Sequence, residues 1–170
     1  MSYILKTERL LLRKLTTGDS DFIIRLVNTE GWIKYIGDRN IKTHEQALTY
    51  LNNGPIKSYH ENGFGLWLVE LKDDHIPIGI CGILKRKELE HADIGFAFLP
   101  EFTGNGYALE ISKAVLRYTR ETFKLETISA ITLPNNKNSI RLLEKLGMQF
   151  VKELSFPNQE DMLLLYSTLN

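Results

Sequence analysis

Two glycines one residue apart, Gly104 and Gly106, stand out in the stretch "FLPEFTGNGYALEISKAVLRYT" at residues 98–119. An apolar run precedes them and a segment of helical period follows, which predicts a strand passing into a helix. The free N–H groups of a first helical turn bind anions, and glycine lets a phosphate approach the backbone closely. The alternative is that Gly104-Asn105-Gly106 is only a turn, the usual fate of an isolated pair. The pair therefore predicts an anion site or a plain turn.

The common nucleotide motifs do not fit this glycine pair. Leu109 stands where the dinucleotide fingerprint needs its third glycine, and the pattern G-x-x-x-x-G-K-[ST] does not occur in the chain. The four histidines and the single cysteine also lack the spacing of a metal site. We therefore expect no nicotinamide or flavin cofactor and no metal.

Acidic side chains and one histidine gather just before the apolar run "DIGFAFL". Glu88, Glu90 and His91 belong to "KRKELEH", which is most simply a charged, solvated hairpin turn. Asp93 lies inside the strand pattern and is the better candidate for a catalytic base. A chain of water molecules is the alternative base.

A polar run, "NNKNS" at residues 135–139, precedes another helical pattern. Asn and Ser are preferred N-caps, so helix capping alone would explain Asn136 and Ser139. Lys137, Arg141 and Lys145 recur on one side of the same helix. They could contact phosphate, but a solvated basic face is the commoner role of such residues.

Three aromatic residues, Trp32, Tyr35 and Phe64, lie in the segments "NTEGWIKYIGD" and "ENGFGLW". These segments contain glycine and are predicted to be loop-like, outside the part of the chain that holds the glycine pair. We expect the three residues to contact a substrate. The alternative is that each anchors the core, as aromatic residues more often do.

The elements that must position these residues alternate between strand and helix patterns. Strands are predicted at residues 9–15, 65–72, 77–84, 92–99, 127–133 and 162–169, and residues 149–154 offer one more. Helices are predicted at residues 16–29, 43–53, 106–123 and 138–147, the last ended by Gly147. The order predicts one α/β domain over residues 1–170, with a mixed sheet that carries helices on its faces.

Composition limits the classes of partner. Lysine plus arginine equals aspartate plus glutamate at 21 each, so no global field attracts nucleic acid or an anionic membrane. No apolar run approaches the length of a membrane span, and Cys81 alone cannot form a disulfide framework. We expect a cytoplasmic protein without nucleic-acid or membrane partners. Nothing in the sequence marks an interface, so a homodimer is possible.

Two stretches about thirty residues apart, "FLPEFTGNGYALE" and "NNKNSIRLLEKLGMQF", resemble the acyl-coenzyme A binding core of the GCN5-related N-acetyltransferase (GNAT) family. The resemblance is closest to the branch of the ribosomal-protein N-terminal acetyltransferases (RimJ/RimL-like). It covers nearly the whole chain, because "TERLLLRKL" and "PIGICGIL" resemble earlier strands of that branch. Thr103 and Asn105 depart from it, since relatives usually have Gln or Arg at the first position and often a basic residue at the second.

The resemblance implies a GNAT-like fold of six to seven mostly antiparallel strands, in which strand 92–99 splays away from strand 127–133. Acetyl-coenzyme A is then the co-substrate, with its pyrophosphate on the glycine loop and its pantetheine arm between the splayed strands. An N–H near Phe98 or Leu99 polarises the thioester, Asn136 bonds the pantetheine amide, and Ser139 protonates the leaving thiolate. The implied cofactor contacts are Phe98, Leu99, Thr103, Gly104, Asn105, Gly106, Tyr107, Ala108, Asn136, Ser139 and Arg141.

Two functions follow from this interpretation. The first is an enzyme that moves an acetyl group from acetyl-coenzyme A directly to a primary amine, either a protein N-terminal amine or a small-molecule amine. The second is a non-catalytic acyl-coenzyme A binding protein that serves as a sensor or scaffold. The helix after Asn136 lacks the tyrosine that many relatives use as a proton donor, which leaves the second function open.

Overall fold

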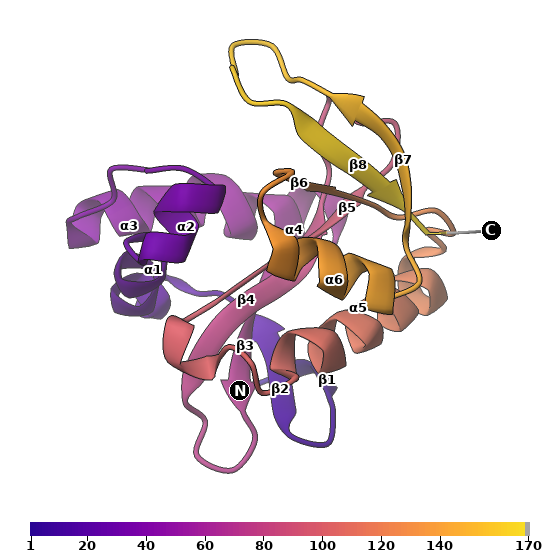
Figure 1. Cartoon of the computed structure of the whole chain (residues 1–170). Coiled ribbons are helices and arrows are strands. Elements are labelled where there is room, and N and C mark those ends of the chain that lie inside the picture. Colours follow the sequence, from indigo (N-terminus) through magenta and orange to yellow (C-terminus); the bar gives the residue numbers. More distant parts are fainter. Residues whose placement is uncertain (169–170) are drawn as a thin grey trace.

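A single sheet organises residues 1–168, which the computed structural model describes (Figure 1). Its eight strands lie in the order β1-β2-β3-β4-β5-β6-β8-β7. The strands are β1 Tyr3–Lys6, β2 Leu10–Lys14, β3 Leu66–Leu71, β4 Pro77–Leu84, β5 Asp93–Phe98, β6 Ser129–Thr132, β7 Gln149–Leu154 and β8 Leu163–Ser167. Neighbouring strands are antiparallel except β5 and β6, which run parallel. The predicted mixed sheet is confirmed.

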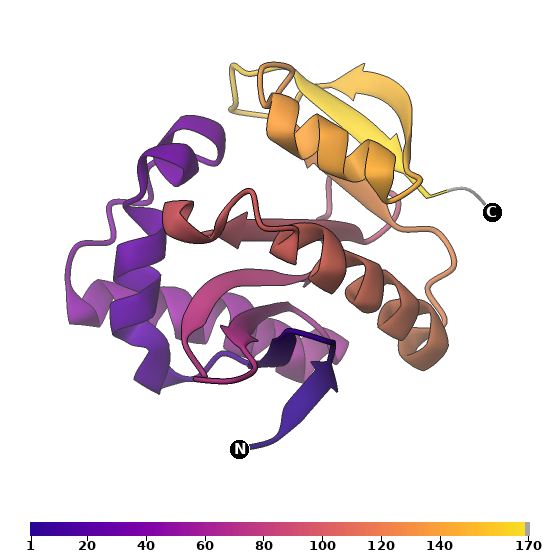
Figure 2. The same cartoon turned by 60° about the horizontal axis from the view of Figure 1, so that its bottom comes forward.

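Within residues 1–168, six α-helices cover the two faces of this sheet. They are α1 Ser20–Val27, α2 Glu30–Tyr35, α3 His44–Leu51, α4 Lys57–Asn62, α5 Tyr107–Phe123 and α6 Lys137–Lys145. Alternate residues of β3 enter two different cores: Trp67 and Val69 pack with the buried side of α5, whereas Leu68 packs with α1 and α3. Figures 1 and 2 show α5 and α6 side by side, with the sheet between them and α1–α3. Helices on both faces are therefore confirmed.

One prediction about the strands needs correction, and two others are confirmed. The sheet has eight strands among the described residues where six to seven were expected, because β1 is short and its four residues show no clear alternation. Strand β7 occupies residues 149–154, which were noted as one more strand. The last predicted strand, 162–169, is confirmed as β8, although residue 169 lies outside the described residues.

The helical segments after residue 29 also differ from expectation. The segment "NTEGWIKYIGD" was predicted to be loop-like, but Thr29 caps it by accepting a hydrogen bond from the N–H of Trp32, and α2 forms despite Gly31. Helix α3 was expected to stop at "NNGP". It continues instead through a π-helical turn, Asn52–Ile56, into α4. The wider turn accommodates Pro55, which has no N–H to donate.

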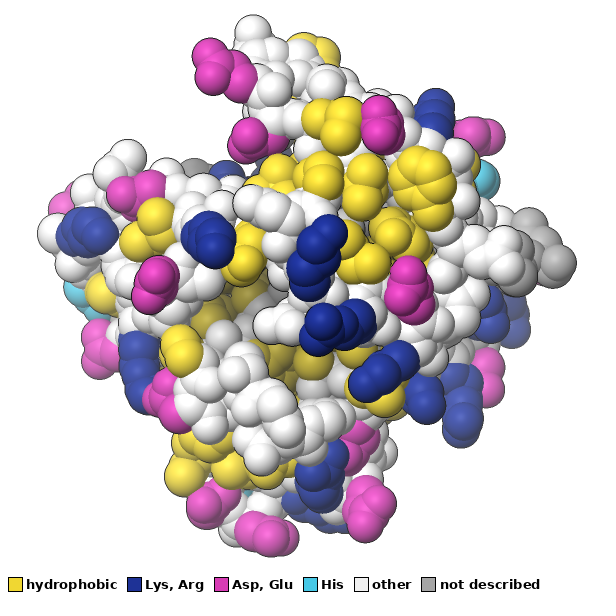
Figure 3. Space-filling view, viewed as in Figure 1, with side chains coloured by type: hydrophobic (Ala, Val, Ile, Leu, Met, Phe, Trp, Pro, Cys, Tyr) yellow, Lys and Arg dark blue, Asp and Glu magenta, His cyan; other side chains and the backbone are white. Residues whose placement is uncertain are grey.

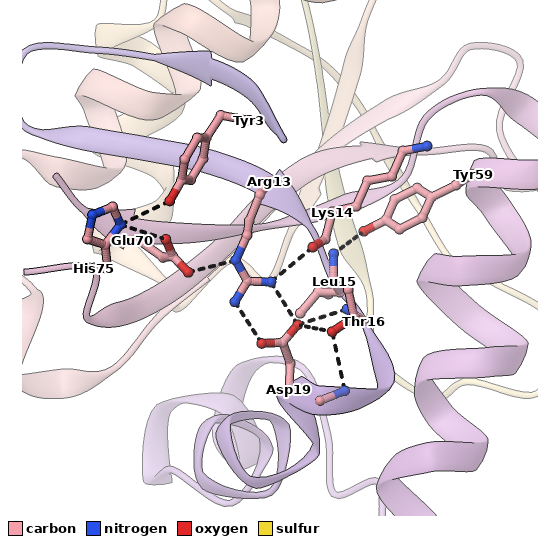
Figure 4. A network of polar contacts seen from close by, with 10 residues as sticks. Tyr3, Arg13, Lys14, Leu15, Thr16, Asp19, Tyr59, Glu70 and His75 are labelled. Atoms are coloured by element: carbon pink, nitrogen blue, oxygen red, sulfur yellow. Dashed lines mark hydrogen bonds and ion pairs between the residues drawn. The ribbon is translucent and has the colours of Figure 1, made fainter. Parts of the chain in front are cut away.

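A buried ionic network ties α1 to the sheet (Figure 4). Arg13 of β2 is 6% exposed and donates from Nη1 and Nη2 to both oxygens of Asp19, at 2.9 and 2.8 Å. Its Nε donates to Glu70 of β3 at 2.6 Å, and Thr16 donates its N–H to Asp19 at 2.8 Å. Every guanidinium nitrogen of Arg13 thus has an acceptor, which offsets the cost of burying its charge.

Candidate functional site

Strands β5 and β6 pair with each other only at their first residues. Within the described residues their register contains one pair, Asp93 with Ser129, beside a hydrogen bond of 2.9 Å from Ser129 N to Ala92 O. Beyond this pair the strands part, and we call the opening the β5–β6 split. The splayed central strands expected from the family resemblance are therefore present. Figure 3 shows a hollow with hydrophobic side chains on its floor between the surface of α1–α2 and that of α6.

The backbone N–H groups of β5 point alternately toward β4 and away from it, and this decides which of them face the split. Leu99 donates its N–H to Ile78 O of the β4 side at 2.9 Å. Because N–H groups along an antiparallel strand alternate in direction, those of Phe96 and Phe98 point away from β4, toward the split. Of the two donors predicted for a thioester, Leu99 is thus engaged in the sheet and Phe98 faces the opening.

The glycine pair forms the loop between β5 and α5, and both glycines have positive φ, +79° at Gly104 and +81° at Gly106. Gly106 is the N-cap of α5, and among the described residues no side-chain hydrogen bond caps the first turn. A Cβ on Gly104 would meet no atom within 4 Å, so the loop is open on that side. Residues 104–108 therefore offer the uncapped, positive end of a 17-residue helix to an anion.

The loop residues predicted to contact the cofactor differ in which of their hydrogen-bond donors are free. Thr103 uses both its N–H and its hydroxyl on Pro100 O, at 3.2 and 2.7 Å. Asn105 donates its side-chain amide to Thr103 O at 3.3 Å. Tyr107 and Ala108 are the first residues of α5, so their N–H groups have no partner within the helix. Backbone rather than side chains supplies the donors here.

Helix α6 begins with Asn136, whose Oδ1 accepts a hydrogen bond of 3.3 Å from the N–H of Ser139. Asn136 is therefore the cap, and Ser139 is the third residue of the helix, so the capping interpretation holds for Asn136 and not for the Ser139 hydroxyl. Arg141 is exposed one turn after Lys137. In Figure 3 the Lys and Arg side chains form a band over α6 and α5.

Asp93 lies at the closed end of the split and is 1% exposed. Burial raises the pKa of Asp93 to about 6, against the opposing effect of the Arg86 guanidinium, whose Nε lies 3.2 Å from both carboxylate oxygens. A strand rises about 3.4 Å per residue, so Asp93 lies roughly 10 Å along β5 from Phe96 and roughly 17 Å from Phe98. Direct proton transfer to Asp93 therefore requires a substrate that reaches toward Phe96.

The three aromatic residues predicted to contact substrate have different surroundings. Phe64 is 7% exposed and packs edge-on against Phe123 at 5.4 Å, so it anchors the core, which was the alternative to a substrate contact. Trp32 is buried on α2, and its Nε1 has no hydrogen-bond partner among residues 1–168. Tyr35 is half-buried, with Lys34 Nζ 5.0 Å from its ring centroid.

Arg9 was not identified from the sequence. It lies between β1 and β2, and its Nη1 donates to Asn105 O at 2.9 Å. Its guanidinium also covers the ring of Tyr107, 4.5 Å from the centroid. No short-range signal connects positions nearly one hundred residues apart; only the resemblance of "TERLLLRKL" to an opening strand pointed to this segment.

Cys81 is fully buried on β4, with Sγ 3.7 Å from the hydroxyl of Ser112. Burial raises the pKa of the Cys81 thiol to about 12, so it stays protonated and out of reach of solvent. In the part of the chain that the structure describes, no three His, Cys, Asp or Glu residues come together as a metal site. No helix in that part has the length and apolar character needed to cross a bilayer.

Comparison with known proteins agrees with this geometry. The family model described as "Acetyltransferase (GNAT) domain" matches residues 9–149. The uncharacterized N-acetyltransferase YoaA of Bacillus subtilis is 32% identical over 148 residues, which cover 86% of this chain and 82% of YoaA.

Solved structures share the fold. The ribosomal-protein-S5-alanine acetyltransferase from Vibrio fischeri has a TM-score of 0.80 at 19% identity, covering 98% of this chain and 96% of that chain. The spermidine N-acetyltransferase from Vibrio cholerae, solved with CoA and spermine, has a TM-score of 0.77 at 22% identity and 95% coverage of both chains.

Proposed function

The chain belongs to the GNAT acetyltransferase family, and on that premise we propose that it transfers an acetyl group directly to the nitrogen of a primary amine. It is an acetyl-coenzyme A-dependent N-acetyltransferase, so acetyl-coenzyme A is the co-substrate. The proposal is carried by one observation: β5 parts from β6 beyond Asp93, and the chain then runs through Gly104 and Gly106 into the uncapped N-terminus of α5. A strand-like arm with a pyrophosphate at its end fits this arrangement.

The residues present suit coenzyme A in chemistry. The N–H groups of residues 104–108 would hold the pyrophosphate, because they are uncapped and the loop is open at Gly104. The backbone of β5 that faces the split would bond the amides of the pantetheine arm as a neighbouring strand would. Asn136 and Arg141, at the start of α6, would contact the arm and the phosphates respectively.

Acetyl-coenzyme A would supply the thioester: its carbonyl carbon would bond the amine nitrogen, the carbon–sulfur bond would break, and the sulfur would leave with the electron pair. The N–H of Phe98 donates to the carbonyl oxygen as negative charge develops there. The hydroxyl of Ser139 donates a proton to the leaving sulfur and regains one, through water, from the nitrogen that becomes the amide. The helix cap does not require that hydroxyl. Asp93, or water leading to it, accepts the proton that the amine loses.

Direct transfer is favoured over a covalent enzyme intermediate by the environment of Cys81. It is the only cysteine of the chain, and it is 0% exposed with a pKa raised to about 12. A thiol in that state cannot take up the acetyl group as a thiolate nucleophile. The amine therefore attacks the thioester itself while both substrates are bound.

The acceptor is tested by measuring release of coenzyme A thiol with a panel of amines. Spermidine and spermine represent small polyamines, and short peptides with free N-termini represent protein acceptors. The same peptides with acetylated N-termini and no lysine are the matched controls. We expect at least one free amine to release thiol and to gain an acetyl group by mass spectrometry, while the blocked peptides do not. Absence of release with every amine, at cofactor concentrations that saturate the protein, contradicts the proposal.

The role of Asp93 predicts a pH dependence. A carboxylate whose pKa is about 6 accepts protons only above that pH, so kcat/KM should rise about tenfold per pH unit below about 6 and less steeply above it. Asp93→Asn should abolish this step. The control is Glu90→Gln, because Glu90 belongs to the exposed turn before β5 and should leave the profile unchanged. A wild-type profile in Asp93→Asn would show that the proton goes to water instead.

A further inference from the structure

Arg9 connects the turn between β1 and β2 to the glycine loop. Its Nη1 donates to Asn105 O at 2.9 Å, and its guanidinium stacks over Tyr107, 4.5 Å from the ring centroid. Its Nη2 lies 3.4 Å from the place that a Cβ on Gly106 would occupy. The guanidinium therefore lies against three consecutive residues of the loop.

Two carboxylate hydrogen bonds fix Arg9 in this position. Its Nε donates to Glu110 Oε2 at 2.7 Å, and its backbone N–H donates to Glu110 Oε1 at 2.9 Å. Thr7 donates its hydroxyl to the same Oε1 at 2.7 Å. Burial alone would raise the pKa of Glu110, but the hydrogen bonds from Thr7 and Arg9 lower it below its ordinary value. The carboxylate thus stays charged and holds the guanidinium by its edge.

The contact with Asn105 O has a consequence for the next N–H group. In a trans peptide the C=O and the N–H point in opposite directions across the C–N bond, and the structure has no cis peptide among its described residues. The carbonyl of Asn105 points toward Arg9, so the N–H of Gly106 points away from Arg9. Among the described residues no acceptor bonds that N–H, so it is free to bond an anion. The peptide between Asn105 and Gly106 would otherwise rotate easily, because Gly106 tolerates both signs of φ.

We propose that Arg9 is a positioning residue for the cofactor: it holds the Asn105–Gly106 peptide so that the Gly106 N–H is aimed at the pyrophosphate. Arg9 acts from behind the loop, through the peptide, rather than as a ligand of the phosphate. The Tyr107 stack and the Glu110 pair keep the guanidinium in place when the cofactor leaves. This inference rests on the proposed cofactor site and adds the residue that prepares it.

The test uses Arg9→Met, which keeps the length of the side chain, and Arg9→Lys, which keeps its charge. The control is Arg117→Met, because Arg117 is exposed on α5 and its loss removes the same charge without touching the loop. Calorimetry gives the Kd for coenzyme A, which carries the pyrophosphate, and for pantetheine, which does not. Steady-state kinetics with acetyl-coenzyme A separates KM from kcat.

In Arg9→Met we expect the Kd and KM for the full cofactor to rise about tenfold or more. This is the effect of losing one hydrogen bond to a charged group, here the bond from the Gly106 N–H to the pyrophosphate. The Kd for pantetheine and the kcat should change less than about twofold, as should every value in the control. Arg9→Lys should recover only a small part of the affinity, because an ammonium cannot bond Asn105, Glu110 and the ring together.

Three results would overturn the role of Arg9. Equal losses of affinity for coenzyme A and pantetheine would mean that Arg9→Met damages the site in general. Full recovery of affinity in Arg9→Lys would mean that only the positive charge matters. An unchanged Kd in Arg9→Met would mean that Arg9 has no role in cofactor binding. If Arg9→Met does not fold, Arg9→Lys and Glu110→Gln make the same comparison, and wild-type affinity in both contradicts the proposal. Wild-type protein that fails to bind coenzyme A would instead contradict the proposed cofactor site itself.

Discussion

Position 104 favours glycine because of its backbone φ angle and not because a side chain would be crowded there. Its φ is +79°, a conformation that costs an L-residue about 1 to 2 kcal/mol, and a Cβ there would meet no atom within 4 Å. Gly147 provides the same conditions far from the loop, because its φ is +81° and its Cβ position is also open. The two glycines form a matched pair in which only the surroundings differ.

Gly104→Ala and Gly147→Ala should therefore lose similar stability, about 1 kcal/mol each by chemical denaturation. Only Gly104→Ala should weaken the binding of coenzyme A, by about tenfold or more, since its methyl group would lie in the loop that we propose holds the pyrophosphate. The measurement is the Kd of each variant alongside its unfolding free energy. Equal affinities in the two variants would remove the glycine loop from the cofactor site.

Variants at Asn136 and Ser139 test helix capping and catalysis separately. Asn136 accepts the capping hydrogen bond, so Asn136→Ala should lose about 1 kcal/mol of stability. Ser139→Ala removes a hydroxyl that the cap does not use, so its stability should stay within about 0.5 kcal/mol of wild type. Its kcat should fall about tenfold to a hundredfold if the hydroxyl protonates the thiolate. If Ser139→Ala keeps full turnover, the Ser139 hydroxyl does not protonate the thiolate and water does so instead.

Residues whose role depends on local chain geometry were predictable from the sequence. The positive φ of Gly104, Gly106 and Gly147 and the cap at Asn136 follow from residue type and position next to a helix. Roles that depend on distant partners were not. Arg9 meets Asn105 across 96 positions, and the burial of Phe64 depends on Phe123 at the far end of α5.

At the scale of elements, long periodic segments were predicted well and short ones were not. Strands β2 to β6, helix α5 and helix α6 match their predicted positions, because each shows a clear period and an end signal. Strand β1 and helix α2 have four and six residues, too few to show a period. Helix α3 was ended too early because Pro55 usually breaks a helix, and a π-helical turn instead carries the chain past it.

The link between α1 and the sheet predicts acid sensitivity. Burial would raise the pKa of Asp19, but hydrogen bonds from Arg13 and Thr16 lower it below its ordinary value. The unfolded chain therefore binds this proton first, and the stability from the pair is present above about pH 4 and is lost as the pH falls further. Asp19→Asn should lose about 3 kcal/mol at pH 7, because it leaves the buried Arg13 short of a charged partner.

The measurement is the unfolding free energy of both proteins from about pH 3 to about pH 7. The gap between wild type and Asp19→Asn should shrink as the pH falls below about 4. Lys57→Met is the control, since its pair with Glu61 is exposed on α4 and should be nearly neutral at every pH. A gap that is constant with pH would contradict the assignment of the effect to Asp19.

The whole molecule has no net charge yet must bind a highly charged cofactor, so its charge is distributed locally. Lys and Arg side chains form a band over α5 and α6 (Figure 3). Composition alone predicted the absence of a global field, but not that basic side chains gather over these two helices. The band forms because α5 and α6 pack side by side.

The central claim is acetyl transfer to an amine with both substrates bound at the β5–β6 split. It is tested most directly by steady-state kinetics in which acetyl-coenzyme A and the accepted amine are varied together, with the mass of the protein recorded in the absence of amine. We predict intersecting reciprocal plots, thiol release that requires amine, and a protein that never gains an acetyl group. Parallel plots with a burst of thiol and an acetylated protein would contradict the claim.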